Sequence, residues 1–209
     1  MTIALLPVKK LEDSKSRLLT SLDDATRQAL TLAMFRDVVD ALAATPGIDR
    51  TAVTTPDETV AEAAREAGVE VLLRPEPGLN AALEDGIERL VPGRDEDLLF
   101  VLGDVAGALA EDFARLLAAA ADAPRGVFLA PSADGGSSAV LHRPAGVIPC
   151  CFGRASAERH REAAAAAGVA YHEIPLASLA IDLDAPEDLE AFMATEGGGR
   201  RTRAVLTDA

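Results

Sequence analysis

Blocks of apolar residues alternate with blocks of amphipathic sequence along the first 130 positions, and each block has the length of one strand or one helix. Short runs rich in apolar and β-branched side chains predict strands at residues 2–7, 51–55, 69–73, 98–102 and 126–130. Apolar side chains at helical spacing predict helices between them, at residues 25–44, 56–66, 79–91 and 110–121. Strands that are apolar along their whole length are buried on both faces. The pattern therefore predicts an α/β fold, with a mostly parallel sheet lying between helices.

The second half of the chain is less regular. Residues 138–141 and 169–174 predict strands on either side of a helix at residues 156–167, and residues 181–184 predict a further strand before a last helix. From Glu196 the chain continues Gly-Gly-Gly-Arg-Arg-Thr-Arg, a composition typical of a mobile tail. We therefore expect a single domain at residues 1–195 and a flexible C-terminal tail at residues 196–209.

Composition narrows the class of function. The 209 residues carry a formal net charge of -14, whereas nucleic-acid binding needs a broad basic surface, so no nucleic-acid partner is expected. The apolar stretches are too short to cross a bilayer, and the N-terminus lacks the pattern of a signal peptide. Cys150 and Cys151 are adjacent and belong to no spaced metal or redox pair. We expect a cytoplasmic protein, without a membrane partner, whose cysteines are reduced.

All lysines of the chain, Lys9, Lys10 and Lys15, lie close together just after the first predicted strand. The cluster reverses the sign of the charge locally, and such reversals attract compact anions such as phosphates. Arg17 adds a guanidinium that can grip two phosphate oxygens. Ligands of open α/β sheets bind at the carboxyl ends of strands. We therefore expect an anion site formed by Lys9, Lys15 and Arg17, with Lys10 facing solvent; the alternative is a solvated basic turn.

Neither of two common phosphate-binding motifs follows the first strand. The Gly-rich loop that ends in Lys-Ser/Thr and the fingerprint of three spaced glycines are both absent from it, which disfavours P-loop enzymes and NAD dehydrogenases. Instead, Asp104 follows the most apolar predicted strand, in the run Leu102-Gly103-Asp104. A carboxylate at this edge of the sheet favours a metal site, although an aspartate there also commonly caps a turn.

Asp182 and Asp184 stand two residues apart in a predicted strand, so both carboxylates should project from one face. Two like charges on one face repel unless a cation holds them, and Mg²⁺ binds in this way through carboxylates and substrate phosphates. An alternative is a capping box from Asp184 to Glu187, with Asp184 capping the last helix. Capping leaves Asp182 unexplained, so we expect a metal site formed by Asp182, Asp184 and Asp104.

Two loops rich in small polar residues offer backbone amides to an anion, at residues 134–138 and 152–156. Ser156 is expected to be the N-cap of a helix, which would combine a hydroxyl, free amides and the positive end of the helix dipole. Ordinary turn and cap chemistry explains either loop equally well. His142, His160 and His172 are interpreted as structural side chains.

These features recur together in a recognisable order. The set comprises Leu6-Pro-Val-Lys9, Lys15-Ser-Arg-Leu18, Gly78-Leu-Asn80, Gly103-Asp104, Asp134-Gly-Gly136, Phe152-Gly153 with Ser156 and His160, and Asp182-Leu-Asp-Ala-Pro-Glu-Asp-Leu189. Each motif alone is weak, but the ordered set resembles the CofC/FbiD guanylyltransferases of coenzyme F(420) biosynthesis over residues 3 to 192.

The resemblance implies a single-domain, Rossmann-like nucleotidyltransferase fold of the MobA-like or GT-A type. It implies transfer of GMP from GTP to a phosphorylated three-carbon acid, phosphoenolpyruvate or 2-phospho-L-lactate, with Mg²⁺ as cofactor and release of pyrophosphate. It also implies a downstream transferase that uses the guanylylated product, and a homodimer is compatible with it. The implied residues are Lys9, Lys15 and Arg17 on the triphosphate, Gly78, Leu79 and Asn80 near the nucleotide, Asp104, Asp182 and Asp184 on the metal, and Ser138, Gly153 and Ser156 on the acceptor. Of these, Lys15, Arg17 and Asp104 would be catalytic.

The chain departs from the family pattern after Asp104, where Val105-Ala106-Gly107 replaces the usual leucine-proline turn. Two alternatives stay open, one because the residues themselves do not identify guanine and one because of this altered loop. The first is another transferase of the same fold, acting on molybdopterin, a cytidylyl acceptor or a sugar nucleotide. The second is a non-catalytic module that binds a nucleotide.

Overall fold

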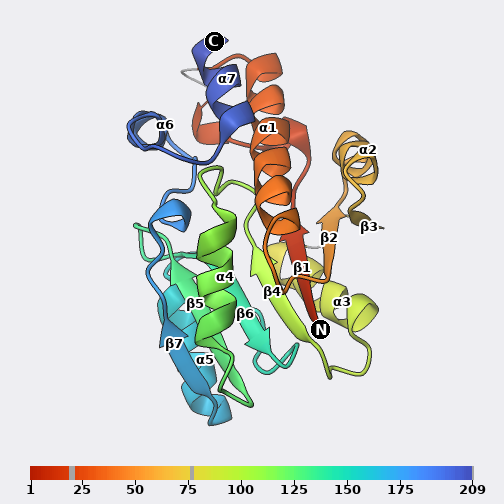
Figure 1. The fold of residues 1–209 in the computed structure, drawn as a ribbon. Coiled ribbons are helices and arrows are strands. Elements are labelled where there is room, and N and C mark those ends of the chain that lie inside the picture. Colours follow the sequence, from red (N-terminus) through yellow and green to blue (C-terminus); the bar gives the residue numbers. More distant parts are fainter. Residues whose placement is uncertain (19–21, 76–77, 209) are drawn as a thin grey trace.

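A seven-stranded sheet forms the centre of the computed structural model, which describes residues 1–18, 22–75 and 78–208 (Figure 1). The strand order is β3-β2-β1-β4-β6-β5-β7. In chain order the strands are β1 (Thr2–Pro7), β2 (Arg50–Thr55), β3 (Glu70–Leu73), β4 (Asp97–Val101), β5 (Gly126–Pro131), β6 (Ser137–Arg143) and β7 (Ala170–Glu173). β6 is antiparallel to both of its neighbours, and the other strand pairs are parallel. The predicted α/β fold with a mostly parallel mixed sheet is confirmed.

Helices cover both faces of this sheet. They are α1 (Asp24–Ala43), α2 (Glu58–Glu66), α3 (Leu79–Leu90), α4 (Ala110–Ala119), α5 (Ser156–Ala167), α6 (Pro186–Met193) and α7 (Arg200–Asp208), with short 3-10 turns η1 (Leu11–Asp13), η2 (Ser16–Leu18) and η3 (Ala177–Leu179). Among the described residues, none of these helices combines the length and hydropathy that crossing a membrane requires.

The alternation of side chains along each strand divides the core into two layers. In β1, Ala4 and Leu6 pack with α1, α2 and α4, whereas Ile3 and Leu5 pack with α3 and α5. All four side chains are completely buried. Burial of each leucine or isoleucine contributes about 1.5–3 kcal/mol. This two-sided burial explains why the strands are apolar without interruption.

The strand order reverses beside β1, and this reversal locates the ligand edge. The chain runs from β1 outward through β2 to β3 and then returns to place β4 on the other side of β1. The connections that leave the carboxyl ends of β1 and β4 therefore diverge, which opens a crevice between them. In the described part of the chain these connections carry residues 8–18, 22–23 and 102–109, and so contain the lysine cluster and Asp104.

The C-terminal segment differs from the mobile tail that its composition predicts. Residues 200–208 form α7, which lies beside α1 at the top of Figure 1. Asp37 of α1 holds the start of α7, because its carboxylate accepts hydrogen bonds from the Arg201 amide at 3.1 Å and from the amide and hydroxyl of Thr202, both at 2.8 Å. This cap comes from a residue distant in sequence, so local composition could not reveal it.

The glycines before α7 lie against the loop that follows Asp104. A Cβ atom on Gly198 would meet the Gly107 carbonyl oxygen at 2.4 Å, and one on Gly199 would meet the Ala106 carbonyl oxygen at 2.9 Å. Only residues without side chains allow this approach. The glycine run is therefore a packing element that contacts the loop in which the chain departs from the family pattern.

Candidate active site

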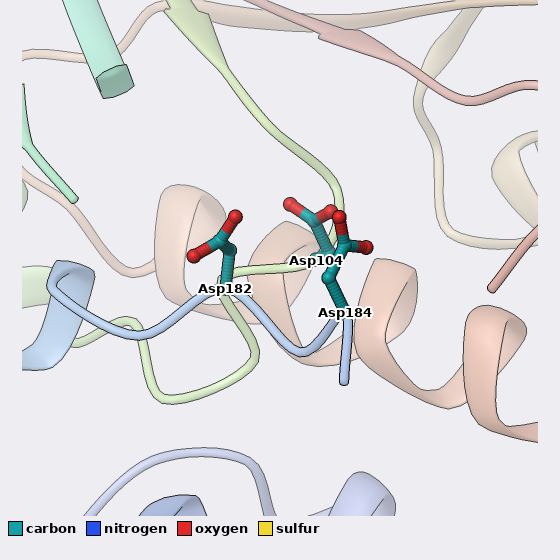
Figure 2. A group of neighbouring side chains, drawn as sticks. All are labelled: Asp104, Asp182 and Asp184. Atoms are coloured by element: carbon teal, nitrogen blue, oxygen red, sulfur yellow. The ribbon is translucent and has the colours of Figure 1, made fainter. Parts of the chain in front are cut away.

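Three aspartates from two distant segments converge at the carboxyl edge of the sheet (Figure 2). Asp104 follows β4, and Asp182 and Asp184 precede α6. One carboxylate oxygen of each residue lies within 4.8 Å of the corresponding oxygens of the other two. The predicted grouping of these three acids is therefore present in the structure.

The segment that carries Asp182 and Asp184 does not join the sheet as the predicted strand would, and it turns at Leu183, where the Asp184 amide donates to the Asp182 carbonyl oxygen at 3.1 Å. Leu183, between the two acids, is completely buried, and its amide donates a hydrogen bond to the carbonyl oxygen of Asp104 at 3.2 Å. With Leu183 buried in this turn, one carboxylate oxygen of each neighbouring aspartate lies within 4.8 Å of a carboxylate oxygen of Asp104.

The predicted capping box at the start of α6 uses different residues. The carboxylate of Asp188 accepts from the amide of Asp184 at 3.0 Å and from that of Ala185 at 2.6 Å, and Ala185 stands at the N-cap position. Neither Asp184 nor Glu187 supplies the capping carboxylate. The Asp184 side chain is thus left for the acid cluster.

Lys15 connects two of the three acids. Its Nζ atom donates to Oδ2 of Asp104 at 2.8 Å and to Oδ1 of Asp184 at 2.7 Å, and its side chain is 7% exposed. The Lys15 backbone has a φ of 55°, a left-handed conformation that costs a residue other than glycine about 1–3 kcal/mol. Two partly buried ion pairs offset this strain and hold the lysine in the crevice.

Charge in the cluster is distributed unevenly. Burial, followed by repulsion from Asp104, raises the pKa of Asp182 to about 6. Burial opposes ionisation of Asp184 too, but the ammonium of Lys15, with Arg17 and Lys9 farther away, holds the pKa of Asp184 below its ordinary value. Burial also opposes the charge of Lys15, but the two carboxylates raise the pKa of that ammonium. Asp182 is therefore the acid that lacks a compensating cation.

A small apolar cluster lies beneath the acids and the basic loop. It contains Leu18, Leu30, Met34, Ala106, Leu183 and Phe192, with Val205 and Leu206 of α7 packed against it. Leu18 follows Arg17, Ala106 lies two residues after Asp104, and Leu183 separates the other two acids. The basic loop and the two segments that carry the acids thus each bury an apolar residue in the same cluster.

A cavity of about 320 Å³ opens beside the acids, within the range of about 300–1,000 Å³ typical of ligand pockets. Its lining includes Lys9, Lys15, Gly78, Leu79, Asp104 and Asp184. The structure therefore brings together the lysines, two of the acids and the first turn of α3. Arg17 lies outside this lining, on the exposed surface of η2, where its charge still acts on Asp184.

The residues expected to bind the acceptor lie around the starts of β6 and α5. The Ser138 hydroxyl oxygen is buried and has no hydrogen-bond partner among the described residues. Gly153 is exposed and has a φ of 119°, a conformation that favours glycine. Ser156 is not the N-cap of α5, since Ala155 occupies that position with a φ of 51°. The buried hydroxyl of Ser156 donates a hydrogen bond to the hydroxyl of Ser137 at 2.9 Å.

The amide group of Asn80, which is expected near the nucleotide, bonds the backbone of Phe152. Its Nδ2 atom donates to the carbonyl oxygen of Phe152 at 3.0 Å, and its Oδ1 atom accepts from the Phe152 amide at 2.8 Å. Sequence reasoning missed this pairing, because 72 residues separate the partners. The motifs Gly78-Leu-Asn80 and Phe152-Gly153 were each visible, but nothing local indicated that they touch.

His160 is a satisfied buried side chain, as its position on the helix predicted. Its Nε2 atom accepts from the Cys151 amide at 3.3 Å, so the proton lies on Nδ1, which donates to the Ser156 carbonyl oxygen at 2.8 Å. Burial lowers the pKa of His160 to about 4, although the Ser156 carbonyl opposes this shift. A neutral imidazole engaged on both nitrogens supports the backbone and has no proton-transfer role.

The acid cluster fits a divalent cation. It offers carboxylate oxygens, the ligands that Mg²⁺ prefers. One of them, Oδ1 of Asp104, is buried and has no hydrogen-bond partner within the described part of the chain. Three carboxylates and one ammonium together carry a formal charge of −2, which a divalent cation would balance. The described residues can therefore hold a metal ion.

Comparison with solved structures places this geometry in a known fold. The chain superimposes with a TM-score of 0.81 on a protein of Desulfovibrio desulfuricans G20 assigned to the nucleotide-diphospho-sugar transferases, at 16% identity over 99% of this chain and 94% of that one. It also matches a CMP:2-keto-3-deoxy-manno-octonic acid synthetase complexed with CTP, with a TM-score of 0.62 at 14% identity over 92% of this chain and 98% of that one. At these identities the likeness shows the nucleotidyltransferase fold.

Sequence comparison is more specific. A phosphoenolpyruvate guanylyltransferase of Rubrobacter xylanophilus is 40% identical over 200 residues, 96% of this chain and 97% of the relative. A 3-phospho-D-glycerate guanylyltransferase of Phenylobacterium zucineum is 36% identical over 214 aligned positions, 100% of this chain and 96% of the relative. The model of the family "Guanylyl transferase CofC like" matches residues 2–208. With the acid cluster, the basic loop and the cavity in the arrangement described above, the chain belongs to the CofC-like guanylyltransferases.

Proposed function

We propose that this protein transfers GMP from GTP to the phosphate of a phosphorylated three-carbon acid and releases pyrophosphate, in the biosynthesis of coenzyme F(420). The observation that carries the proposal is the Asp104–Lys15–Asp184 ion-pair cluster at the cavity between β1 and β4. The match to the CofC-like family over residues 2–208 supports guanine as the base.

The reaction needs little proton chemistry from the protein. An oxygen of the acceptor phosphate attacks the α-phosphorus of GTP, and the bond from that phosphorus to the oxygen bridging it to the β-phosphate breaks. The attacking oxygen is already anionic, so no general base is required. This agrees with His160, which is neutral and occupied on both nitrogens.

The barrier is electrostatic, because an anion must approach a triphosphate. Lys9 and Lys15 line the cavity and can partly neutralise the phosphates. Arg17 is exposed and near enough for its charge to act on Asp184, and its flexible side chain can reach toward the departing pyrophosphate. In this proposal Lys15 also keeps Asp104 and Asp184 close together before substrate binds.

We propose Mg²⁺ as the cofactor, held by Asp104, Asp182 and Asp184. When bound, it supplies positive charge to the reacting phosphates. The raised pKa of Asp182 supports this assignment, since an uncompensated acid in a carboxylate cluster gains most from a cation.

Phosphoenolpyruvate is the acceptor we favour, because relatives named phosphoenolpyruvate guanylyltransferase include the one at 40% identity. The relative at 36% identity, named for 3-phospho-D-glycerate, makes that acid the second candidate. The third is 2-phospho-L-lactate, which the family resemblance implies. All three present a phosphate and a carboxylate on a three-carbon skeleton.

A panel of acceptors tests the proposal. The purified protein is incubated with GTP, MgCl₂ and each of the three acids, and pyrophosphate release and the mass of the guanylylated product are followed. We expect release that depends on an acceptor and is fastest with phosphoenolpyruvate. GTP binding without release for any acceptor would indicate a non-catalytic module, and faster turnover with CTP than with GTP would indicate a different transferase.

A further inference from the structure

Side chains of two helices hold the backbone amides of residues 150–152, which precede the loop expected to bind the acceptor. Oε1 of Glu84 accepts from the first amide at 2.6 Å, Nε2 of His160 from the second at 3.3 Å, and Oδ1 of Asn80 from the third at 2.8 Å. Ordinary loops bond such amides to backbone or to water. Because three successive amides bond to side chains, those side chains fix the position of this segment.

Asn80 differs from the other two side chains, because it bonds the peptide groups on both sides of Phe152. An amide side chain is required, since one group must accept from an N–H while the other donates to a carbonyl oxygen. Aspartate would lack the donor, and glutamine would carry the same group one methylene farther from the backbone. Asn80 is also the single asparagine in the 209 residues.

The aromatic ring of Phe152 is fixed independently of Asn80. It is 3% exposed and lies edge-on to Phe100, with ring centroids 6.0 Å apart, and to His160, at 5.0 Å. Packing alone sets where this residue sits but leaves its peptide planes free to rotate. Asn80 bonds both of those planes, and the Arg159 guanidinium donates a further hydrogen bond to the Phe152 carbonyl oxygen at 3.2 Å. Of these two side chains, Asn80 is the one that bonds the peptide groups on both sides of Phe152 and so orients the path of the chain into Gly153.

Asn80 also lies next to the nucleotide side of the site. It follows Gly78 and Leu79 at the first turn of α3, and both of those residues line the cavity that contains Lys15 and Asp104. A single residue therefore joins the cavity wall to the loop leading to Gly153 and Ser156.

We propose that Asn80 is a positioning residue that orients the acceptor-binding loop relative to the bound nucleotide, and that it does not itself bind the nucleotide. This inference rests on the proposed function. It predicts that loss of the Asn80 side chain weakens use of the acceptor while GTP binding is preserved. A direct nucleotide contact, which the family resemblance implied, predicts the opposite pattern.

The test compares Asn80→Ala and Asn80→Asp with the wild type and with Glu88→Gln, a substitution on the exposed face of the same helix. Initial rates of pyrophosphate release are measured with phosphoenolpyruvate varied at saturating GTP, and then with GTP varied. For Asn80→Ala we expect the KM of the acceptor to rise roughly tenfold, the loss expected for removed hydrogen bonds. The KM of GTP in Asn80→Ala should match the wild type. The control Glu88→Gln should match the wild type in both KM values and in thermal midpoint.

Asn80→Asp retains the acceptor for the Phe152 amide, so it should lie between Asn80→Ala and the wild type. It also keeps the test decisive if Asn80→Ala fails to fold. A raised KM for GTP with an unchanged KM for the acceptor, in either variant, would overturn the proposal.

A second readout does not depend on turnover. Hydrogen exchange at the amides of residues 150–153 should accelerate in Asn80→Ala, while the affinity for Mg²⁺-GTP, measured by calorimetry, stays at the wild-type value. Unchanged exchange or weakened GTP binding would refute the positioning role. If the wild type releases no pyrophosphate with any acceptor, the proposed function fails, and the exchange and binding data still decide the role of Asn80.

Discussion

Nζ of Lys15 lies 2.8 Å from Oδ2 of Asp104, across 89 positions of sequence. The contact joins the loop after β1 to the loop after β4, on the two sides of the point where the strand order reverses. It combines a basic group suited to phosphates with an acid suited to a metal. The Asp104 carboxylate raises the pKa of the Lys15 ammonium, although burial opposes that charge, and substitutions should reveal how far the two side chains depend on each other.

Replacement of Asp104 by asparagine should abolish activity without unfolding the protein. The substitution removes one charged ligand from the acid cluster and keeps the shape of the side chain, so pyrophosphate release should fall by at least roughly a hundredfold. Circular dichroism should match the wild type. Asp95→Asn, at an exposed position before β4, is the control and should retain full activity. Wild-type turnover in Asp104→Asn would refute the metal assignment.

Lys15→Met should separate metal binding from catalysis. Removing the ammonium leaves three carboxylates close together without their internal cation. Their mutual repulsion should strengthen binding of a divalent cation, while turnover falls by roughly a hundredfold because a charge facing the phosphates is lost. Titration with Mn²⁺ followed by electron paramagnetic resonance measures the affinity. Lys10→Met, which removes an exposed lysine paired with Glu12, should change neither quantity; weaker Mn²⁺ binding in Lys15→Met would contradict the argument.

Mild acid should destabilise the fold through two buried histidines. Burial, and then His160, lowers the pKa of His142 to about 3, and the pKa of His160 is lowered to about 4. Both are near 6.5 in the unfolded chain, which therefore binds more protons below that pH. Stability should be complete above about pH 6.5 and should fall as the pH drops toward 4, by up to about 2 kcal/mol per histidine at pH 5. Urea unfolding at pH 7 and pH 5 measures this loss.

The variant His142→Phe tests how much of that loss of stability comes from His142. Its ring lies edge-on to Phe100, with centroids 4.9 Å apart, and neither of its nitrogens has a hydrogen-bond partner in the part of the chain that the structure describes. His142→Phe should therefore reduce the difference between the two pH values. His172→Gln, at an exposed position, should leave that difference unchanged. Equal pH dependence in His142→Phe and the wild type would show that His142 does not titrate with folding.

The junction between α1 and α7 should contribute measurably to stability. Asp37→Ala removes the acceptor of the hydrogen bonds from Arg201 and Thr202 and leaves buried donors unpaired, which should cost about 1–3 kcal/mol. Thermal unfolding measures the loss. Asp40→Asn removes only the surface partner of the Arg201 guanidinium and should cost less than about 1 kcal/mol. Equal effects of the two variants would argue against a specific cap.

Much of the fold follows from local sequence. Strands buried on both faces are apolar without interruption, so the predicted run at residues 98–102 lies within one residue of β4, Asp97–Val101. The position of Asp104 after this strand followed directly, because strand ends define the ligand edge of such sheets.

What local sequence could not supply was the choice among partners distant in the chain. Asp188, rather than Glu187, caps α6, because backbone geometry decides which acid reaches the free amides. The C-terminal segment is polar and rich in glycine, yet it is ordered by Asp37, more than 160 positions earlier. Asn80 likewise finds Phe152 only in the folded chain. The composition of a segment is local, whereas its order and its contacts depend on residues distant in the chain.

The antiparallel course of β6 has an evolutionary consequence. Because β6 runs against its neighbours, the hairpin at residues 132–136 brings Ser138 to the same edge as the loops after β1 and β4. Hairpin tips tolerate changes in length and composition better than strands do. Variation there could alter which small acid is accepted while the strands beneath the nucleotide stay unchanged. Two relatives named as guanylyltransferases of different acids are 40% and 36% identical to this chain. Such a pair is expected where the acceptor acid changes during evolution and the nucleotide stays the same.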